Sequence, residues 1–235
     1  VQVIETQKPR FLAIAFDRNE PTFRHETDSN YKANRKETPE DFIVDIKNLQ
    51  LLLSALDISV ITSPGYEADD IIATLSQQAS NSGYAVKIVS GDRDLFQLVD
   101  RQKNQAIKSS SSSYPEFDPE AVEEKLGIKP NQVVDYKALC GDKSDNIPGV
   151  RGIGEKTAVK LLNEYKTLVG VYQNIGNISG AVKKKLEEGK EDAEHSRYLA
   201  QLIFNVPIDI SIEECKLQGF DLKNLTPVLE KLELH

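Results

Sequence analysis

The sequence lacks methionine altogether and has only two cysteines among its 235 residues. The missing initiator methionine is by itself only a weak indication of truncation. Cys140 and Cys215 stand far apart without a Cys-x-x-Cys spacing, which argues against a disulfide framework or a zinc site and favours a reducing, cytoplasmic setting. No apolar run approaches the ~20 residues of a membrane-spanning helix, and the first ten residues lack the features of a signal peptide. We therefore expect no membrane partner. We also expect the protein to be a monomer.

The chain also lacks an excess of positive charge. It carries 29 basic and 37 acidic residues, for a net charge of −8. Such a balance argues against a protein that binds nucleic acid through its overall field. A nucleic-acid function would need local basic patches, or metal ions that neutralise an acidic pocket.

Short apolar runs followed by helical patterns predict an α/β fold. The three runs expected to form strands are 11–16, 58–62 and 84–89. A helix is expected after Thr38 as N-cap, with Pro39 at its first position and Phe42, Ile43, Ile46, Leu49, Leu53 and Leu56 on one face. A second helix is expected over 68–79. Strands that alternate with helices predict a mostly parallel central sheet with helices on both faces.

The second half of the sequence is predicted to be helical. We place a boundary near Asp118, between a core of residues 1–117, with a polar arch segment over 18–37, and a helical part over 118–235. The run Ser109–Ser113 predicts a surface loop. In the second part, Asp118-Pro119-Glu120 is expected to cap a helix that ends at Gly127. Further helices are expected over about 130–140, 155–165, 180–188 and 192–204. Both parts are expected to pack as one unit.

Carboxylates follow the ends of all three predicted strands. The six acids at these strand ends are Asp17, Glu67, Asp69, Asp70, Asp92 and Asp94, and two more, Asp142 and Asp145, could join them from the helical half. Ligands of open parallel sheets bind beyond the carboxyl ends of the strands, where these acids would concentrate negative charge. Each acid alone could be a helix cap or a turn residue. Together they favour a site for hard cations such as Mg²⁺ or Mn²⁺.

Oxygen ligands without nearby histidine point away from zinc. Two divalent ions ~4 Å apart stabilise the attacking and leaving oxygens of an in-line phosphodiester displacement. The acids therefore predict a hydrolase that acts on phosphate esters.

A glycine-rich stretch between predicted helices offers a second site. Pro148 to Ala158 contains Gly152-Ile-Gly154 and Lys156, but no strand precedes it and it matches neither a dinucleotide fingerprint nor a Walker loop. It predicts a helix-hairpin-helix over about 140–165, whose free backbone N–H groups could hold a phosphate. The alternative is a turn between packed helices.

The arch segment mixes basic and aromatic side chains that suit a phosphate backbone and a frayed base. They are Arg24, His25, Tyr31, Lys32 and Arg35. A charged segment can also be merely solvated, which is the interpretation we prefer for the run Lys183–Lys185.

These motifs occur in one order along the chain. They are Phe16-Asp17, Phe23-Arg-His-Glu26, Tyr31-Lys-Ala-Asn-Arg35, Gly65-Tyr-Glu-Ala-Asp-Asp70, Gly141-Asp-Lys-Ser-Asp-Asn-Ile-Pro-Gly149 and Gly152-Ile-Gly-Glu-Lys-Thr157. In this order the chain resembles, over essentially its whole length, the 5′-nuclease domain of bacterial DNA polymerase I and the flap endonuclease family.

The resemblance implies roles for these residues. The eight acids match the family's metal-site positions, and Lys32 and Arg35 match catalytic basic residues of a helical arch that clamps the scissile phosphate. Gly152, Ile153, Gly154, Lys156 and Thr157 match a hairpin that grips duplex DNA, often with K⁺, and Arg24 and Tyr31 are added as DNA contacts. The implied activity is 5′→3′ exonuclease and 5′-flap endonuclease action on branched or nicked DNA and on RNA primers, in replication and repair, in a nucleoid-associated bacterial protein with a polymerase domain fused to it.

One departure from the family pattern keeps two alternatives open. The family begins with a strand that ends in a metal-binding Asp, and no run before Phe11 supplies it. The first alternative is therefore a catalytically impaired module that holds branched DNA. The second is a related Mg²⁺-dependent RNase or phosphatase on a similar sheet.

Overall fold

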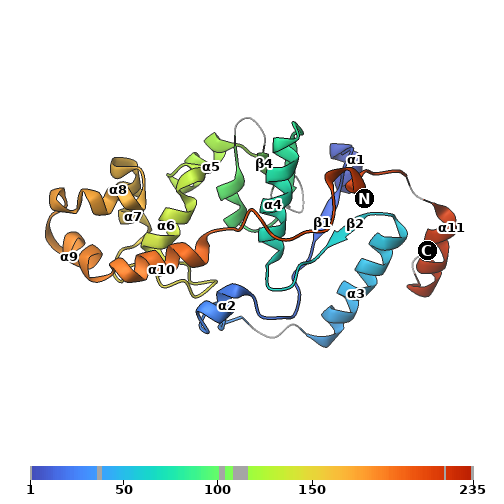
Figure 1. Ribbon diagram of the computed structural model, residues 1–235, viewed down its shortest axis with the longest axis horizontal. Helices are drawn as coiled ribbons and strands as arrows, with labels where there is room; N and C mark the ends of the chain where they lie inside the picture. The colour runs from blue at the N-terminus through green and yellow to red at the C-terminus, as the bar shows by residue number, and fades with distance from the viewer. Residues whose placement is uncertain (1, 36–38, 101–103, 108–115, 220, 234–235) are drawn as a thin grey trace. The chain divides into compact units, whose positions relative to one another are not determined.

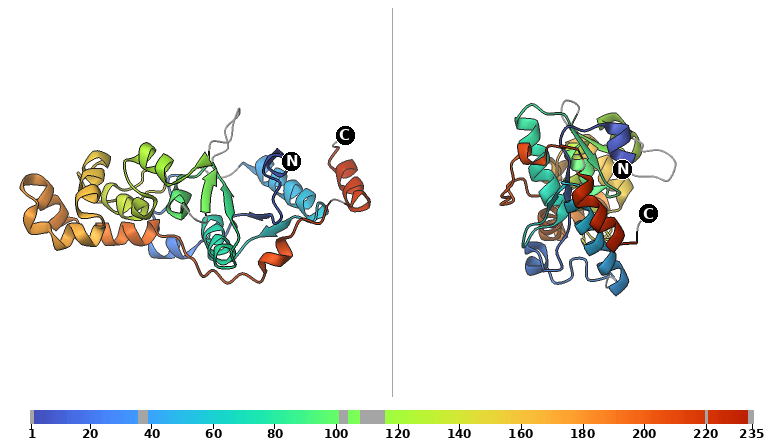
Figure 2. Two further views of the ribbon diagram at one scale, coloured as in Figure 1. Left: turned by 90° about the horizontal axis from the view of Figure 1, so that it is seen from above. Right: turned by 90° about the vertical axis from the view of Figure 1, so that its right-hand side faces the viewer.

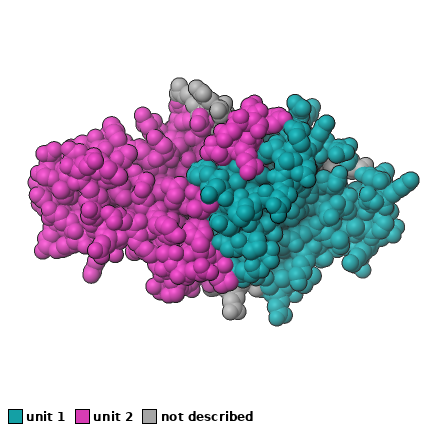
Figure 3. Space-filling model, viewed as in Figure 1, with its two compact units in different colours: residues 1–20, 36–75, 204–235 teal, residues 21–35, 76–203 magenta. Residues whose placement is uncertain are grey.

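The protein, here a computed structural model, divides into two compact units, each built from segments that are distant in the sequence (Figure 3). The structure describes residues 2–35, 39–100, 104–107, 116–219 and 221–233. Unit 1 comprises residues 1–20, 36–75 and 204–235, and unit 2 comprises residues 21–35 and 76–203. The predicted boundary near Asp118 lies inside unit 2.

Unit 1 contains a two-stranded parallel sheet and the helices around it. Its elements are α1 (Gln2–Gln7), β1 (Ala13–Ala15), α3 (Glu40–Ala55), β2 (Ser59–Ile61), the start of α4 (Ala68–Asn81), the 3₁₀ helix η4 (Ile212–Cys215) and α11 (Leu222–Lys231). Strands β1 and β2 pair from Ala13 opposite Ser59 to Ala15 opposite Ile61. Helices α3 and α11 lie side by side (Figures 1 and 2). The shared direction of β1 and β2 puts their carboxyl ends at one edge of the sheet.

Helix α3 differs from its prediction in two respects. Pro39 is the residue that flanks the helix rather than its first helical residue, and Thr38 lies outside the described residues. The expected apolar face is only partly covered, because Leu53 is buried whereas Phe42 is 57% exposed and Leu49 is 45% exposed. Helical periodicity identified the helix correctly, but the side that packs depends on neighbours that are distant in the sequence.

Unit 2 combines a three-stranded sheet with a bundle of short helices. Its elements are α2 (Phe23–Thr27), β3 (Val86–Val89), η1 (Asp94–Leu98), β4 (Asn104–Ile107), β5 (Glu116–Phe117), α5 (Pro119–Leu126), η2 (Pro130–Gln132), α6 (Val133–Cys140), α7 (Glu155–Tyr165), α8 (Leu168–Gln173), η3 (Ile175–Asn177), α9 (Gly180–Glu188) and α10 (Lys190–Ala200). Strand β4 is central, parallel to β3 and antiparallel to β5.

Local sequence signals explain several of the helices in unit 2. Asp118 accepts a hydrogen bond from the Ala121 amide at 2.8 Å and caps α5, and Gly127 ends it with a φ of 72°, a conformation that favours glycine. The core of the bundle buries Leu139, Leu162 and other apolar side chains from successive helices. Helices α7 and α9 have the predicted bounds.

The fold class is therefore confirmed as mixed α/β, with parallel strands and a helical C-terminal part. The strands of the described residues form two sheets rather than one, because β3 pairs with β4 instead of β2. No strand was predicted at Asn104–Ile107, and the predicted serine loop 109–113 lies outside the described residues. Across the described ranges, no helix is long and apolar enough to cross a membrane.

Candidate active site

In unit 1, four of the predicted site acids gather at the start of α4. Asp17 follows β1, and its Oδ1 accepts a hydrogen bond from the Ala68 amide at 2.7 Å. The Glu67 amide donates to Asp70 Oδ2 at 3.2 Å, and both of these acids are buried. Asp69 and Asp70 lie in the first helical turn, where negative charge is favoured by the helix dipole. Both hydrogen bonds join a carboxylate to a backbone amide at the start of α4, which agrees with the simpler expectation of acids at a helix start; a shared metal site for these acids remains a prediction.

In unit 2, Asp92 and Asp94 form a tight turn between β3 and η1. The Ser90 hydroxyl accepts a hydrogen bond from the Asp92 amide at 3.0 Å, and Asp92 Oδ1 accepts one from the Asp94 amide at 2.9 Å. Asp94 begins η1, whose Leu95 and Phe96 are buried. The buried apolar pair anchors the turn, so the Asp94 side chain has a defined position.

The loop after α6 fixes Asp142. Its backbone pairs with Ile147 through two hydrogen bonds of 2.8 Å, and its Oδ1 accepts bonds from the Ser144 amide at 2.8 Å and the Ser144 hydroxyl at 2.5 Å. Gly149 closes the loop so tightly that a Cβ there would lie 2.2 Å from the Gly141 nitrogen. The loop is therefore held by backbone contacts that only glycine permits at this position.

Lys137 of α6 joins the two acidic elements. Its ammonium donates to Asp94 Oδ1 and to Asp142 Oδ2, the latter at 2.6 Å. The three side chains are 10%, 18% and 20% exposed, in the order Lys137, Asp94 and Asp142. Two carboxylate oxygens from different elements thus converge on one cation.

Burial and the ammonium act in opposite directions on this group. Burial raises the pKa of Asp94 to about 6, although the positive charge of Lys137 opposes the shift. Burial also acts to raise the pKa of Asp142, but Lys137 and the hydrogen bonds from Ser144 outweigh it and hold that pKa at about 2. The two carboxylates raise the pKa of Lys137 against the effect of its own burial. Lys137 is therefore charged at neutral pH.

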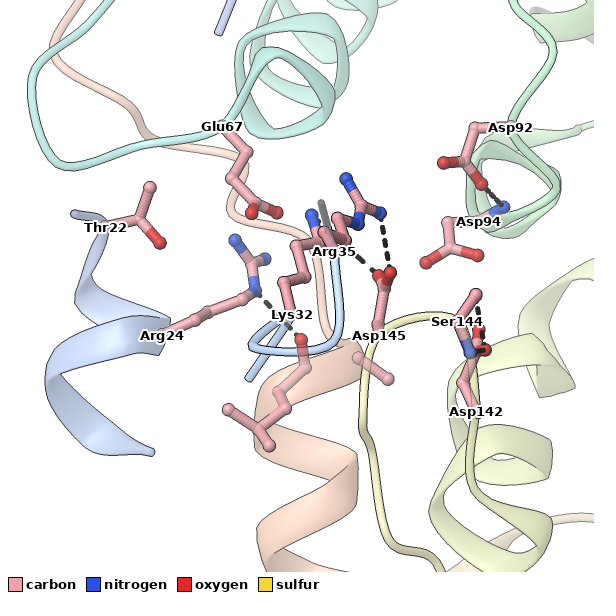
Figure 4. A network of polar contacts seen from close by, with 12 residues as sticks. Thr22, Arg24, Lys32, Arg35, Glu67, Asp92, Asp94, Asp142, Ser144 and Asp145 are labelled. Atoms are coloured by element: carbon pink, nitrogen blue, oxygen red, sulfur yellow. Dashed lines mark hydrogen bonds and ion pairs between the residues drawn. The ribbon is translucent and has the colours of Figure 1, made fainter. Parts of the chain in front are cut away.

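Asp145 is paired with the basic residues of the arch segment (Figure 4). Arg35 Nη2 donates to Asp145 Oδ1 at 2.6 Å, and Lys32 Nζ lies 3.8 Å from Asp145 Oδ2. The Lys32 amide also donates to the Asp145 carbonyl at 2.9 Å, with Lys32 itself at a φ of 55°. In the view of Figure 4, Asp145 lies between these cations and the group formed by Asp92, Asp94 and Asp142.

The described residues contain no group of three or more Asp, Glu, His or Cys side chains close enough to hold a metal ion. The physical reason in unit 2 is that Asp94 and Asp142 are drawn to Lys137, and Asp145 to Arg35, instead of to one another. The predicted eight-acid site therefore stays a proposal.

The hairpin between α6 and α7 combines a buried anchor with an open turn. Val150 and Ile153 are buried, and Gly152 has a φ of 82°. Gly154 is the N-cap of α7 with a φ of −98°, and a Cβ on it would meet nothing within 4 Å. Helix geometry leaves the amides of the first turn, those of Glu155 and Lys156 among them, directed outward, as an anion site requires.

A groove of 1120 Å³ connects this hairpin with the acidic group inside unit 2. Asp94, Lys137 and Asp142 line one part of it, and Gly154 and Lys156 line another. The acidic group and the outward amides of α7 thus open into the same groove.

Two of the predicted DNA contacts, Arg24 and Tyr31, are buried. Arg24 is 1% exposed, and its guanidinium donates to the carbonyls of Leu199 at 2.8 Å and Gln201 at 2.7 Å. Tyr31 is 3% exposed, with Lys32 Nζ 4.9 Å from its ring centre. The sequence could not show this burial, because it gives residue type but not exposure, and the two DNA contacts remain predictions.

Lys137 was not singled out from the sequence, and the run Lys183–Lys185 was interpreted only as a solvated face. The Lys185 ammonium in addition donates to the Gly152 carbonyl at 3.0 Å, in an exposed contact. Lys183 and Lys184 instead form exposed pairs with Glu187 and Glu188. The only sequence signal for Lys137 is a lysine five positions before Asp142, which is too common a pattern to single it out.

Comparison with protein families matches the chain in two consecutive parts. Residues 1–127 match a family model described as 5′-3′ exonuclease, N-terminal resolvase-like domain. Residues 128–223 match 5′-3′ exonuclease, C-terminal SAM fold. The two matches together cover most of the sequence.

Curated relatives are DNA polymerase I proteins of bacteria. The chain is 56% identical over 241 residues to DNA polymerase I of Synechocystis, which covers 100% of the chain and 24% of that protein. It is 40% identical to DNA polymerase I of Bacillus subtilis, with 99% and 27% covered. The chain thus spans about a quarter of the length of these relatives.

Solved structures share the fold at low identity. The 5′-exonuclease of bacteriophage T5 with bound divalent zinc ions matches with a TM-score of 0.72 and 22% identity, over 97% of this chain and 87% of that one. The catalytic core of Rad2 in complex with DNA substrate matches with a TM-score of 0.60 and 20% identity, over 93% and 73%. At these identities the likeness shows the fold alone.

Proposed function

The chain belongs to the 5′-3′ exonuclease family, and from this premise we propose that it is a structure-specific 5′→3′ exonuclease and 5′-flap endonuclease that depends on divalent metal ions. The single observation that carries the proposal is the convergence of Asp94 and Asp142 on one cation position that opens into the hairpin groove. The substrates would be nicked or branched duplex DNA with a 5′ flap and RNA primers on DNA, in replication and repair.

The donor set of the acidic group fits a hard divalent ion. Asp94 and Asp142 already direct one oxygen each at a common positive charge, and carboxylate oxygens are the preferred ligands of Mg²⁺ and Mn²⁺. The resemblance of the motifs supports the role of metal ligand for Asp92 and Asp145 as well and, within unit 1, for Asp17, Glu67, Asp69 and Asp70. When bound, two such ions stabilise the charge that develops on the attacking and leaving oxygens.

The remaining roles fall to basic and backbone groups. Lys32 and Arg35 would hold the scissile phosphate, since both are already directed at the acidic loop through Asp145. The outward amides at the start of α7, together with Lys156, would hold a phosphate of the duplex. Gly152, Ile153 and Thr157 would shape that turn, and the resemblance of the motif supports a K⁺ ion there. The name and length of the curated relatives support a fused polymerase domain.

Cleavage of a 5′-flap duplex, with and without Mg²⁺, tests the proposal. We expect cleavage with Mg²⁺ that excess chelator abolishes. Cleavage of equal rate in chelator would contradict the metal-dependent mechanism. Preference for single-stranded RNA over flap DNA would instead favour a related RNase.

A second candidate is a module that binds branched DNA without cutting it. It is favoured by the pairing of Asp94 and Asp142 with Lys137, and of Asp145 with Arg35, in which protein cations already neutralise these acids. Tight binding of the flap duplex without cleavage at any Mg²⁺ or Mn²⁺ concentration would support this function and contradict the first.

A further inference from the structure

Lys137 is placed differently from an ordinary surface lysine of a helix. It lies on α6 and bridges Asp94, 43 residues earlier in the chain, and Asp142, five residues later. Its side chain is only 10% exposed. A lysine loses considerable rotamer freedom when held in this way, so the contact needs a compensating electrostatic gain.

The gain comes from the two carboxylates. Without a cation between them, Asp94 and Asp142 would hold two like charges in a mostly buried place, which is unfavourable. Asp142 Oδ1 is already engaged by Ser144. The oxygen left for a cation is therefore Oδ2, which Lys137 contacts at 2.6 Å.

We propose that Lys137 is a positioning residue whose ammonium occupies, in the metal-free protein, the place between Asp94 and Asp142 that a divalent ion takes on binding. This inference rests on the proposed function, because it treats both acids as metal ligands. The pair carries two negative charges, of which an ammonium balances one and a divalent ion balances both. The ammonium and the ion cannot share one position, so metal binding displaces Lys137 into the groove that it lines.

The arrangement has two consequences for the protein. Lys137 keeps the turn after β3 and the loop after α6 together before any metal arrives, so the two ligands are arranged in advance. It also competes with the metal, which weakens the affinity of the site. A lysine that merely cross-links the two elements would remain in place when metal binds.

The direct test observes the Lys137 ammonium of the wild-type chain by ¹⁵N NMR during titration with Mg²⁺, with Lys137→Met used for the assignment. A buried, hydrogen-bonded ammonium is expected to exchange slowly with water and to give a distinct signal in chelator. We expect this signal to disappear or move to the position of solvated lysines as Mg²⁺ saturates the site. An unchanged signal at saturation would overturn the proposal.

A matched pair of variants gives an independent measurement. Lys137→Met and Lys143→Met remove the same charge on either side of Asp142, and Lys143 is exposed at the loop surface. Calorimetric titration should show that Lys137→Met binds Mn²⁺ about tenfold more tightly than the wild type. The Mn²⁺ affinity of Lys143→Met should differ from that of the wild type by less than about twofold, because solvent and salt screen the charge of an exposed lysine. In chelator, only Lys137→Met should lower the Tm, by about 5 °C. Equal Mn²⁺ affinities of the two variants would contradict the proposal.

These outcomes are separable from a failure of the proposed function. Mg²⁺-dependent flap cleavage with an unchanged Lys137 signal would remove only the role of Lys137. If Lys137→Met does not fold without metal, Lys137→Arg, which keeps the positive charge, supplies the assignment, and the wild-type titration still decides the question. A wild-type chain that binds neither Mg²⁺ nor Mn²⁺ would remove both.

Discussion

Arg35 donates to the carboxylate of Asp145 at 2.6 Å, so a basic residue of the arch segment is paired with an acid of the proposed metal site. The Asp145 side chain is 6% exposed, whereas that of Arg35 is 51% exposed. The acid is therefore buried, whereas the guanidinium side of the pair stays half exposed to solvent. This pairing places the proposed phosphate-holding residues beside the proposed ligands without any substrate present.

Lys32→Ala is expected to slow single-turnover cleavage of a flap duplex by about tenfold or more, the scale of losing one charge that stabilises a transferring phosphate. Duplex affinity should fall much less, since many other contacts contribute to it. Rapid-quench cleavage at saturating protein measures the first quantity, and fluorescence anisotropy the second. Lys183→Ala, on an exposed helix face, is the control. A Lys32 variant that binds poorly but cleaves normally at saturation would contradict the assigned role.

Gly154→Val should show the opposite pattern. The valine meets no protein atom within 4 Å of its Cβ and needs no positive φ, so folding should be preserved. It would obstruct a phosphate at the start of α7 and weaken duplex binding by about 1–3 kcal/mol. Cleavage at saturation should change little. If both Gly154→Val and Lys32→Ala reduce the saturating rate equally, the hairpin also places the scissile phosphate and the two roles are not separate.

Gly149→Ala is expected to destabilise the protein by about 2–4 kcal/mol. Its φ of 62° is unfavourable for alanine, and the new Cβ would lie 2.2 Å from the Gly141 nitrogen. Gly176→Ala is the matched control, because its Cβ meets nothing within 4 Å. Urea unfolding followed by circular dichroism measures both. Similar free energies of unfolding for the two variants would show that the loop after α6, which carries Asp142, is not held by the close backbone contact at Gly149.

Arg24→Met tests whether this arginine is structural. Loss of its hydrogen bonds to Leu199 and Gln201 would leave buried carbonyls unsatisfied, at a cost of about 2–3 kcal/mol in the free energy of unfolding. Arg18→Met, whose side chain is 40% exposed, should change it by less than about 0.5 kcal/mol. At a temperature where both variants are folded, duplex affinity should equal that of the wild type. A selective loss of affinity in Arg24→Met would restore it to the DNA-binding set.

The sequence predicted those features that depend on neighbouring residues. Caps and apolar periodicity defined α5, α7 and α9, because a helix end or face is encoded within a few positions. Strands β4 and β5 were not foreseen, since short strands are stabilised by partners that the sequence does not identify. For the same reason the sequence did not show how far the predicted face of α3 is covered, with Leu53 buried but Phe42 and Leu49 exposed.

In the candidate site, too, the features set by neighbouring residues were predictable and those set by distant partners were not. The sequence placed Asp17 after a strand, and Asp92 and Asp94 after another, because the order of residues around a strand end is local information. The partners of those acids were not predictable, because Lys137 meets Asp94 across 43 residues and Arg35 meets Asp145 across 110. The burial of Arg24 likewise depends on the end of α10.

The most direct test of the central claim is single-turnover cleavage of a 5′-flap duplex by Asp142→Asn at saturating protein and Mg²⁺. Glu124→Gln, an exposed acid of α5, is the control for the change in charge. We predict that Asp142→Asn loses about 100-fold or more of the rate and keeps its duplex affinity within about threefold, because a metal ligand acts in the chemical step. Cleavage by Asp142→Asn at the rate of Glu124→Gln would contradict the account.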